Sequence, residues 1–336
     1  MKALVSVSPG GPETLVIHEV AEPQLSAGQV LVSIVACGVN FPDSLIIQDK
    51  YQFRPIRPFS PGGEFAGFIE RVSEGVEHLR VGDRVLGSEI FGAMAEKIAI
   101  DATKVFKIPD CMPFDEAAAF LMTYATSYYA LKDRGSLQAG ETLLVLGAAG
   151  GVGLAAVELG KAFGARVIAA TSSVDKTAFC IKHGADAGLV YSRNLELAGM
   201  KAQAEDFKAA VAPGADVIFD PVGGNYTEAA LRAVSWDGRL LVIGFAAGAI
   251  PKIPVNIALL KSCSIVGVFL GGMIAKSQER YRRLVDELFA IYETGKIRPI
   301  VSESFTLSRG GEAISRLASR NAVGKLIITM PDHTSQ

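Results

Sequence analysis

The chain has 336 residues, of which 49% are hydrophobic and 20% charged, and its formal net charge is −2. These values are typical of a globular protein with two domains, each large enough for its own core. The chain has no basic block and no signal-peptide pattern at its start, and its uncharged run 142–157, of 16 residues, is too short to span a bilayer. We therefore expect a cytoplasmic protein with neither a nucleic-acid nor a membrane partner.

The four cysteines lie at positions 37, 111, 180 and 263, and none belongs to a CxxC pair. A disulfide framework or a four-cysteine zinc site is therefore not expected. Each cysteine is interpreted as a small buried hydrophobic residue.

Residues 1–121 are predicted to form a β-rich domain. Short alternating runs such as QVLVSIVA (29–36) and AEKIAI (95–100) are separated by turns rich in glycine and proline. Residues 272–336 are predicted to return to this domain, because they follow a completed sheet. They begin with a charged helix (277–295) and end in two strand-like runs, the second being GKLIITM (324–330).

Residues 122–271 are predicted to form an α/β domain in which strands and helices alternate. Continuous apolar strands between amphipathic helices indicate a parallel sheet covered on both faces, and six strands fit the doubly wound dinucleotide-binding fold. The expected helices are 152–163, 174–183 and 226–234. The expected strands are 142–148, 166–171, 188–192, 216–220, 239–245 and 264–270.

A glycine-rich turn, GAAGGVG (147–153), follows the first of these strands. Glycines let the backbone approach a pyrophosphate, whose charge is held by N–H groups at the start of the next helix. The GxGxxG spacing is imperfect, since it fits only as Gly151, Gly153 and Ala156. The strand before the turn, the helix after it and the second strand favour dinucleotide binding over a purely structural turn.

The end of the second strand indicates which dinucleotide is bound. An NAD-preferring unit has Asp or Glu there, about 20 residues past the glycines, to accept from the ribose hydroxyls. Here Thr171-Ser172-Ser173 stands at that place, and Lys176 follows. Hydroxyls and an ammonium attract a 2′-phosphate that a carboxylate would repel, so NADPH is the expected cofactor. The serines also suit the N-cap of the next helix, and the two roles are compatible.

The chain resembles the medium-chain dehydrogenase/reductase superfamily and, within it, the zinc-independent quinone oxidoreductase group that includes zeta-crystallin. The resemblance covers nearly the whole chain. It implies a GroES-like catalytic domain split around a Rossmann cofactor domain, with the active site in the cleft between them. The motifs that carry it are ACGVNFPD (36–43), SPGGEFAGFIE (60–70), VGDRV (81–85), the glycine turn and GKLII (324–328).

The resemblance also assigns site residues. Asn40, Asp43 and Tyr51 match catalytic positions near the nicotinamide, although this chain has Leu45 where many relatives have a tyrosine. Lys325 matches a basic residue that faces the pyrophosphate. The other cofactor-binding positions are Thr126 at the nicotinamide ring, Gly150, Gly151 and Val152 at the phosphates, Ser172, Lys176 and Tyr191 at the 2′-phosphate, and Gly244 and Phe245 at the carboxamide.

Several of these residues have a simpler interpretation. Asn40 could satisfy backbone groups in a turn, Tyr51 could be a surface aromatic residue, and Lys325 could be a solvated lysine on an edge strand. Asp43 is expected to orient a neighbour rather than to act as a base, and Glu64 is expected to be structural.

The zinc ligands of the related alcohol dehydrogenases are not expected here. Cys37 matches the first ligand, but Gly63 stands before Glu64, where the histidine ligand belongs. One thiolate without partners cannot build a tetrahedral site. The histidines are scattered without ligand spacing, at positions 18, 78, 183 and 333.

These features predict an NADPH-dependent enzyme that transfers hydride to a quinone or a similar electron-poor small molecule without zinc. Two alternatives remain: a reductase of activated alkenes such as enoyl or acryloyl compounds, and a non-catalytic NADPH-binding structural or regulatory protein. The strand 264–270 would leave an apolar edge on the cofactor sheet, so a homodimer is also expected.

Overall fold

The structure is a computed structural model that describes residues 1–331, so His333 lies outside the described residues. The chain forms two compact units. Unit 1 comprises Met1–Met122 and Pro299–Gln336, and unit 2 comprises Thr123–Arg298. The chain thus returns to unit 1 at Pro299 and not at residue 272. The reason is that the charged helix buries Tyr281, Leu284 and Leu288 within unit 2.

Unit 1 is built on an antiparallel sheet with one parallel pair. Its strands are β1 (Lys2–Val5), β2 (Val16–Glu19), β3 (Gln29–Val39), β4 (Glu64–Val72), β5 (Arg84–Ser88), β6 (Lys97–Asp101), β7 (Val105–Lys107), β14 (Val301–Thr306) and β15 (Lys325–Thr329). The seven-stranded sheet has the order β14-β15-β3-β4-β5-β7, with β6 also paired to β3, while β1 and β2 form a separate pair. β3 runs on to Val39, beyond the expected run, because its end pairs with β15.

Three α-helices belong to unit 1: α1 (Phe41–Ile46), α2 (Phe114–Ala117) and α11 (Gly310–Ala318). α1 begins directly after β3 and packs against α11. The residues that directly follow β3, beginning with Asn40, therefore lie beside β15.

Unit 2 contains the expected parallel sheet. Its strands are β8 (Thr142–Leu146), β9 (Arg166–Thr171), β10 (Ala187–Val190), β11 (Ala215–Asp220), β12 (Val234–Val242) and β13 (Ser264–Gly267). They are all parallel, in the order β10-β9-β8-β11-β12-β13, which is the doubly wound order with its switch point between β8 and β11. The expected strand 264–270 is too long, because a helix begins at Leu270.

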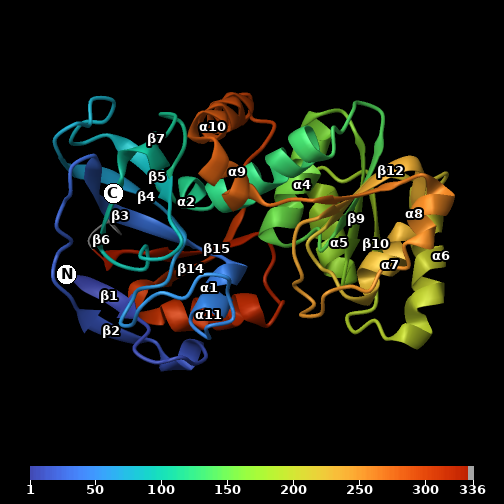
Figure 1. The fold of residues 1–336 in the computed structure, drawn as a ribbon, viewed down its shortest axis with the longest axis horizontal. Coiled ribbons are helices and arrows are strands. Elements are labelled where there is room, and N and C mark those ends of the chain that lie inside the picture. Colours follow the sequence, from blue (N-terminus) through green and yellow to red (C-terminus); the bar gives the residue numbers. More distant parts are fainter. Residues whose placement is uncertain (332–336) are drawn as a thin grey trace. The chain divides into compact units, whose positions relative to one another are not determined.

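Helices cover both faces of this sheet. They are α4 (Gly151–Ala162), α5 (Val174–Lys182), α6 (Met200–Val211), α7 (Asn225–Leu231) and α8 (Asn256–Lys261), shown in Figure 1. α9 (Leu270–Lys276) and α10 (Gln278–Glu293) follow the last strand of the sheet. Leu144 and Ile168 pack with α6 and α7, while Leu143 and Val167 face Gly160 of α4. Adjacent residues of a strand thus enter opposite cores, which is why the strands are continuously apolar.

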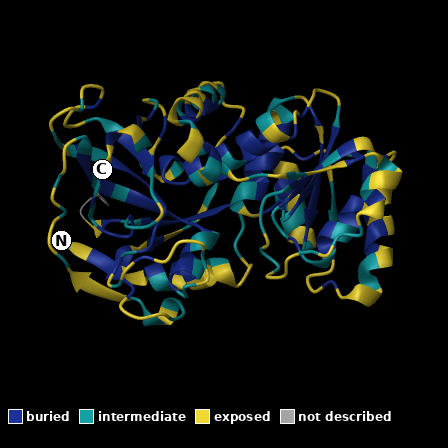
Figure 2. Cartoon of the chain, viewed as in Figure 1, coloured by how far each residue is buried: buried dark blue, intermediate teal, exposed yellow. Residues whose placement is uncertain are grey.

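Burial follows the sheets, as the dark strands and paler outer helix surfaces of Figure 2 show. Three of the cysteines are buried as expected, but Cys111 is exposed because it lies in a turn before α2. Among residues 1–331, no helix has both the length and the apolar character needed to cross a bilayer.

Candidate functional site

The glycine turn joins β8 to α4 at the carboxyl edge of the parallel sheet. Gly147 has a φ of +60°, and a Cβ on Gly153 would lie 2.3 Å from the Gly147 carbonyl oxygen, so neither position accepts a side chain without strain. A Cβ on Gly150 would meet nothing closer than 3.5 Å. The turn is therefore tightly packed against its own strand at Gly153 and open at Gly150.

The N-terminus of α4 directs backbone donors to this open side. The first hydrogen bond of the helix runs from Leu154 N to Gly150 O (2.7 Å). The N–H groups of Gly151, Val152 and Gly153 lie in the first turn, where a helix has no internal acceptor for them. These donors and the positive end of the helix dipole suit a pyrophosphate. The turn thus fits the phosphates of a dinucleotide.

Ser172 and Tyr191 directly follow the carboxyl ends of the paired strands β9 and β10, and Lys176 lies in α5, the helix after β9. The strands pair in parallel, and Tyr191 N extends the ladder by donating to Thr171 O (2.8 Å). Ser173 caps α5, where its hydroxyl accepts from Lys176 N (3.3 Å). Lys176 is therefore held in the first turn of α5, close in the chain to Ser172.

Two residues of the Thr-Ser-Ser sequence serve the fold. Thr171 is buried, and its hydroxyl is bonded to Ser173 O (2.9 Å) and Thr177 Oγ1 (2.7 Å). Ser173 is the helix cap. The half-buried Ser172 is the remaining member of the three and stays the candidate for the 2′-phosphate.

Thr126 lies in a single α-helical turn, α3 (Thr126–Tyr128), between two π-helical stretches, Leu121–Ala125 and Tyr129–Arg134. π-helical turns are rare and occur frequently at functional sites. The neighbouring Ser127 donates from Oγ to Val152 O (2.8 Å). The residue expected at the nicotinamide is therefore tied, through the next residue, to the phosphate turn.

Gly244 and Phe245 follow β12 at the same edge of the sheet. Gly244 N donates to Asp220 O at the end of β11 (3.4 Å), and a Cβ on Gly223 would lie 2.9 Å from Phe245 Cδ1. The buried Asp220 carboxylate shapes this turn by accepting from Val222 N (2.8 Å) and Gly223 N (2.9 Å). Asp220 was not predicted from the sequence, although an acidic residue at the end of a buried parallel strand is a recognisable pattern.

In unit 1, a buried cluster joins Asn40, Glu64 and Lys325. Lys325 Nζ donates to Glu64 Oε1 (2.6 Å), Asn40 Oδ1 (2.8 Å) and Val39 O (3.2 Å). Asn40 Nδ2 donates to Glu64 Oε1 (2.8 Å) and to Gly38 O (3.4 Å). Each polar group of the cluster therefore has a partner, as buried groups require.

This cluster changes the interpretation of Lys325 and Asn40. Lys325 is not a solvated edge lysine, because β15 lies between β14 and β3 and the residue is 4% exposed. Its ammonium already donates three hydrogen bonds, so a pyrophosphate contact would cost it one of them. The Asn40 amide likewise has acceptors for its protons, and we assign it a positioning role. Glu64 is structural, as expected.

Asp43 and Tyr51 lie close to this cluster. Asp43 is 2% exposed, and its oxygens accept from Asn40 N (2.7 Å) and Gly62 N (3.1 Å). Burial raises the pKa of Asp43 to about 6. Tyr51 is partly buried against the hydrophobic core of unit 1. This partial burial and, to a smaller extent, the charge of Asp43 raise the pKa of the Tyr51 hydroxyl. Tyr51 therefore remains a hydrogen-bond donor at neutral pH.

The buried Asp43 predicts a pH-dependent stability. Its pKa rises from 3.8 to about 6 on folding, so its contribution to stability is present below its unfolded pKa and is lost as pH rises through about 6. The shift corresponds to about 3 kcal/mol. Relative to Asp43→Asn, wild type should lose stability by that order between about pH 4 and about pH 7. Urea titrations across this range measure the difference, and a difference that does not vary with pH would contradict the assignment.

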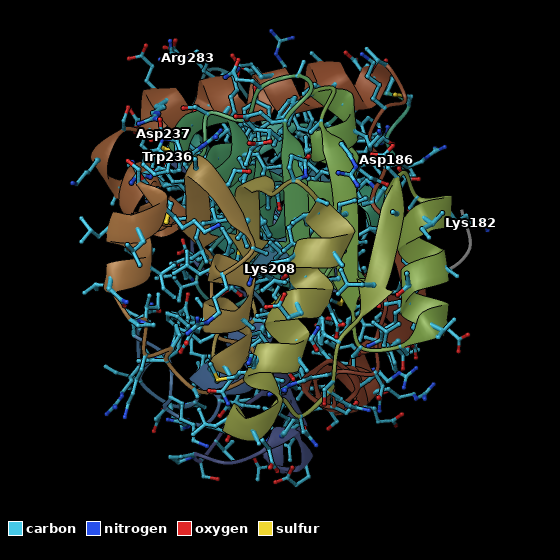
Figure 3. The ribbon with its side chains drawn as sticks, turned by 90° about the vertical axis from the view of Figure 1, so that its right-hand side faces the viewer. Lys182, Asp186, Lys208, Trp236, Asp237 and Arg283 are labelled. Atoms are coloured by element: carbon cyan, nitrogen blue, oxygen red, sulfur yellow. The ribbon has the colours of Figure 1, made fainter. Side chains whose placement is uncertain are left out.

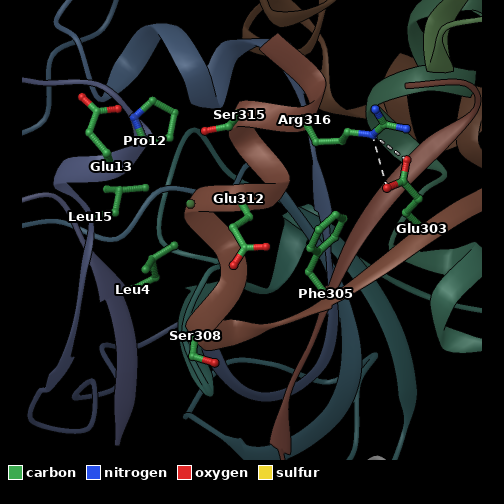
Figure 4. A pocket seen from close by; sticks show the side chains of 11 residues that line it. Leu4, Pro12, Glu13, Leu15, Glu303, Phe305, Ser308, Glu312, Ser315 and Arg316 are labelled. Carbon is green, nitrogen blue, oxygen red and sulfur yellow. Dashed lines mark hydrogen bonds and ion pairs between the residues drawn. The ribbon is translucent and has the colours of Figure 1, made fainter. Parts of the chain in front are cut away.

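A groove of about 610 Å³ lies elsewhere in unit 1, beside α11 and β14 (Figure 4). Leu4, Leu15 and Phe305 give it an apolar lining, and Arg316 Nε donates to Glu303 Oε1 (2.9 Å) at one side. None of the residues assigned above lines it, so this groove is not part of the candidate site.

Known proteins match the chain over most of its length. A family model described as the alcohol dehydrogenase GroES-like domain matches residues 26–110, and one described as zinc-binding dehydrogenase matches residues 151–290. The quinone oxidoreductase-like protein 2 homolog of Nematostella vectensis is 37% identical over 321 residues, which cover 95% of this chain and 86% of that protein. Human quinone oxidoreductase is 30% identical over 334 residues, 98% of each chain.

The fold matches solved structures equally well. The Escherichia coli quinone oxidoreductase complexed with NADPH has a TM-score of 0.88 at 28% identity, covering 98% of this chain and 100% of that one. The GroES-like unit and the doubly wound unit therefore define an oxidoreductase of the medium-chain dehydrogenase/reductase superfamily. Within that superfamily, the chain belongs to the quinone oxidoreductase group. The expected family and fold class are confirmed.

Proposed function

We propose that this protein transfers hydride from NADPH to a quinone without a metal ion. The observation that carries the proposal is the carboxyl edge of the parallel sheet, where the glycine turn, Ser172 and Tyr191 follow the ends of three neighbouring strands and Lys176 lies in the first turn of α5. A glycine turn suits a dinucleotide, and the absence of an acid at Ser172 suits a 2′-phosphate. The relatives named as quinone oxidoreductases, one of them solved with NADPH, support the same reaction.

NADPH, when bound, supplies the hydride. We assign the Tyr51 hydroxyl as the donor to the acceptor oxygen on which negative charge develops, because a tyrosine hydroxyl is a hydrogen-bond donor at neutral pH. Asn40 and Asp43 hold the chain before Tyr51, because Asp43 Oδ2 accepts from Asn40 N and the Asn40 amide is fixed by Glu64. Thr126, Gly244 and Phe245 are assigned to the nicotinamide end.

A panel of acceptors tests this function. The purified protein is mixed with NADPH and a naphthoquinone, an α,β-unsaturated ketone or an enoyl thioester, and the loss of nicotinamide absorbance is followed. We expect the quinone to be reduced fastest. Turnover of the enone or the thioester alone would favour an alkene reductase. Binding of NADPH without turnover of any acceptor would favour the structural or regulatory alternative.

We predict that the purified protein carries no stoichiometric zinc. Gly63 occupies the place of the histidine ligand, and burial raises the pKa of the Cys37 thiol well above its ordinary value, which disfavours the thiolate that zinc needs. Elemental analysis should find far less than one zinc per chain, and a chelator should leave activity unchanged. One zinc per chain together with chelator-sensitive activity would refute the prediction.

We also propose a homodimer that covers the free edge of β13. This strand is the last in the sheet order and pairs with β12 on its other side. Ile265 on the strand and Leu260 on the adjoining α8 are exposed, as is Leu259, at 81%. An open apolar strand edge needs cover, and a second copy about a two-fold axis presents the same surface.

Light scattering tests this assembly. Wild type should have twice the chain mass of 35.5 kDa. Leu259→Glu should shift the protein toward monomer, because it places a carboxylate on the proposed interface. Leu197→Glu is the matched control, since Leu197 is exposed at 76% elsewhere in unit 2. A monomeric wild type at micromolar concentration would count against the dimer, as would equal effects of the two substitutions.

A further inference from the structure

Glu158 is a buried carboxylate in a helix of small and apolar residues. It lies on α4, whose N-terminus forms the phosphate turn, and it is 8% exposed. Its Oε2 accepts from the Tyr124 hydroxyl (2.6 Å) and from the backbone N–H of Arg298 (2.9 Å). None of the roles assigned above uses Glu158, although burying a carboxylate is costly unless its partners are in place.

The two donors to Glu158 lie at the two ends of unit 2. Tyr124 is the second residue of the unit, and Arg298 is its last. A single oxygen of Glu158 therefore fastens both crossover segments, the one that enters the unit and the one that leaves it, to α4.

The buried cluster of unit 1 holds the outer ends of the same crossovers. Met122 N, in the last residue before unit 2, donates to Glu64 Oε2 (2.9 Å). After unit 2, the Ile300 carbonyl accepts from Lys325 N (2.8 Å). Each crossover is therefore fixed on both sides of the boundary, with a single residue, Thr123 or Pro299, between the fixed points.

The entering segment also carries Thr126. It is fastened to α4 at two points, through Ser127 Oγ to Val152 O and through Tyr124 Oη to Glu158 Oε2. The stretches on either side of Thr126 are π-helical, a conformation that is rare in proteins. The Tyr124–Glu158 hydrogen bond is thus, with that of Ser127, one of the side-chain ties between the segment of Thr126 and α4.

We propose that Glu158 is a positioning residue for hydride transfer: through Tyr124 and Arg298 it fixes both crossovers, and with them Thr126, to the helix that receives the pyrophosphate. This inference rests on the proposed function, because Thr126 is assigned there to the nicotinamide. Loss of the tie should disturb the nicotinamide end of the cofactor and leave the adenosine end, at Ser172 and Lys176, unaffected.

Four variants test the proposal. Tyr124→Phe removes one hydrogen bond, and Glu158→Leu removes the oxygen that accepts both. Glu158→Gln keeps an oxygen that can accept from both donors and should restore most of the wild-type behaviour. Tyr128→Phe is the matched control, because Tyr128 Oη bonds Glu287 Oε2 at the same 2.6 Å from the same segment, but toward α10.

Three quantities are measured: affinity for adenosine 2′,5′-bisphosphate, affinity for NADPH by nicotinamide fluorescence, and kcat with a quinone. For Tyr124→Phe and Glu158→Leu we expect unchanged bisphosphate affinity, weaker NADPH binding and a kcat lower by on the order of 10-fold, within the ~100-fold that a 1 Å misplacement can cost. Tyr128→Phe should stay within about twofold of wild type.

The outcomes separate this inference from the proposed function. If wild type binds NADPH but reduces no acceptor, the function fails, and the ratio of NADPH to bisphosphate affinity still tests Glu158. If Tyr124→Phe and Tyr128→Phe behave alike, or if both affinities fall together, Glu158 is merely structural and the proposal is overturned. If Glu158→Leu does not fold, Tyr124→Phe and Glu158→Gln decide the question. A wild type that does not bind NADPH would overturn both.

Discussion

In Lys325→Met we expect the free energy of unfolding to fall by about 3–5 kcal/mol, because the substitution leaves the Glu64 carboxylate buried without its counter-charge. The ammonium of Lys325 holds Glu64 and Asn40 at hydrogen-bond distances of 2.6 Å and 2.8 Å. Removing it also leaves the Asn40 oxygen without the Lys325 ammonium, so the segment that begins at Asn40 should loosen together with the fold. Urea titration of the variant measures the loss.

Two companion variants make this result specific. Lys208→Met removes a lysine that pairs with Glu205 on the exposed surface of α6, labelled in Figure 3, and should cost no more than ~1 kcal/mol. Adding Glu64→Gln to Lys325→Met removes the stranded charge and should recover part of the loss. Equal costs for Lys325→Met and Lys208→Met would show that the buried pair does not stabilise the fold as described.

For the cofactor, we expect Lys176→Ala to weaken NADPH binding by about 10- to 150-fold and to leave NADH binding nearly unchanged. A charge-assisted contact with the 2′-phosphate is worth roughly 1.5–3 kcal/mol, and NADH has no such phosphate. Ser172→Asp should act more strongly, since it repels the 2′-phosphate and offers the ribose of NADH an acceptor. Titration of each variant with both cofactors, followed by nicotinamide fluorescence, measures these changes.

A control on the same helix separates the 2′-phosphate contact from general electrostatics. Lys182 lies at the other end of α5 (Figure 3), so Lys182→Ala changes the net charge equally without touching the phosphate site. It should leave both affinities unaltered. If Lys176→Ala weakens the binding of NADPH and of NADH alike, Ser172 and Lys176 do not contact the 2′-phosphate, and Ser173 is only a helix cap.

The parallel sheet was predictable because its central strands, such as β8 and β9, bury both faces and are therefore continuously apolar. Individual helices and strand ends of this unit were harder to predict. α6 was missed although its buried Ala204, Phe207 and Val211 have the i, i+3 and i+4 spacing of an amphipathic helix. The end of β13 was misplaced because the apolar run continues into α9, and an apolar run by itself does not distinguish a strand from a buried helix.

The arrangement of the residues proposed to bind the cofactor was more predictable from the sequence than the buried cluster of unit 1. The glycine turn, Ser172 and Lys176 lie within 30 residues of chain, so one strand–turn–helix motif brings them together. Glu64 and Lys325, in contrast, are 261 residues apart, and each by itself has an ordinary local interpretation. Only the pairing of β15 with β3 brings them to one buried cluster, and no local pattern encodes that pairing.

The most direct test of this account is the ratio of kcat/KM for NADPH to that for NADH, measured on the wild-type protein with one quinone under the same conditions. The 2′-phosphate contact predicts a ratio of at least about 10 in favour of NADPH, with the quinone reduced in both reactions. A ratio near unity or a preference for NADH would contradict the cofactor assignment, and no oxidation of either cofactor would contradict the proposed reaction.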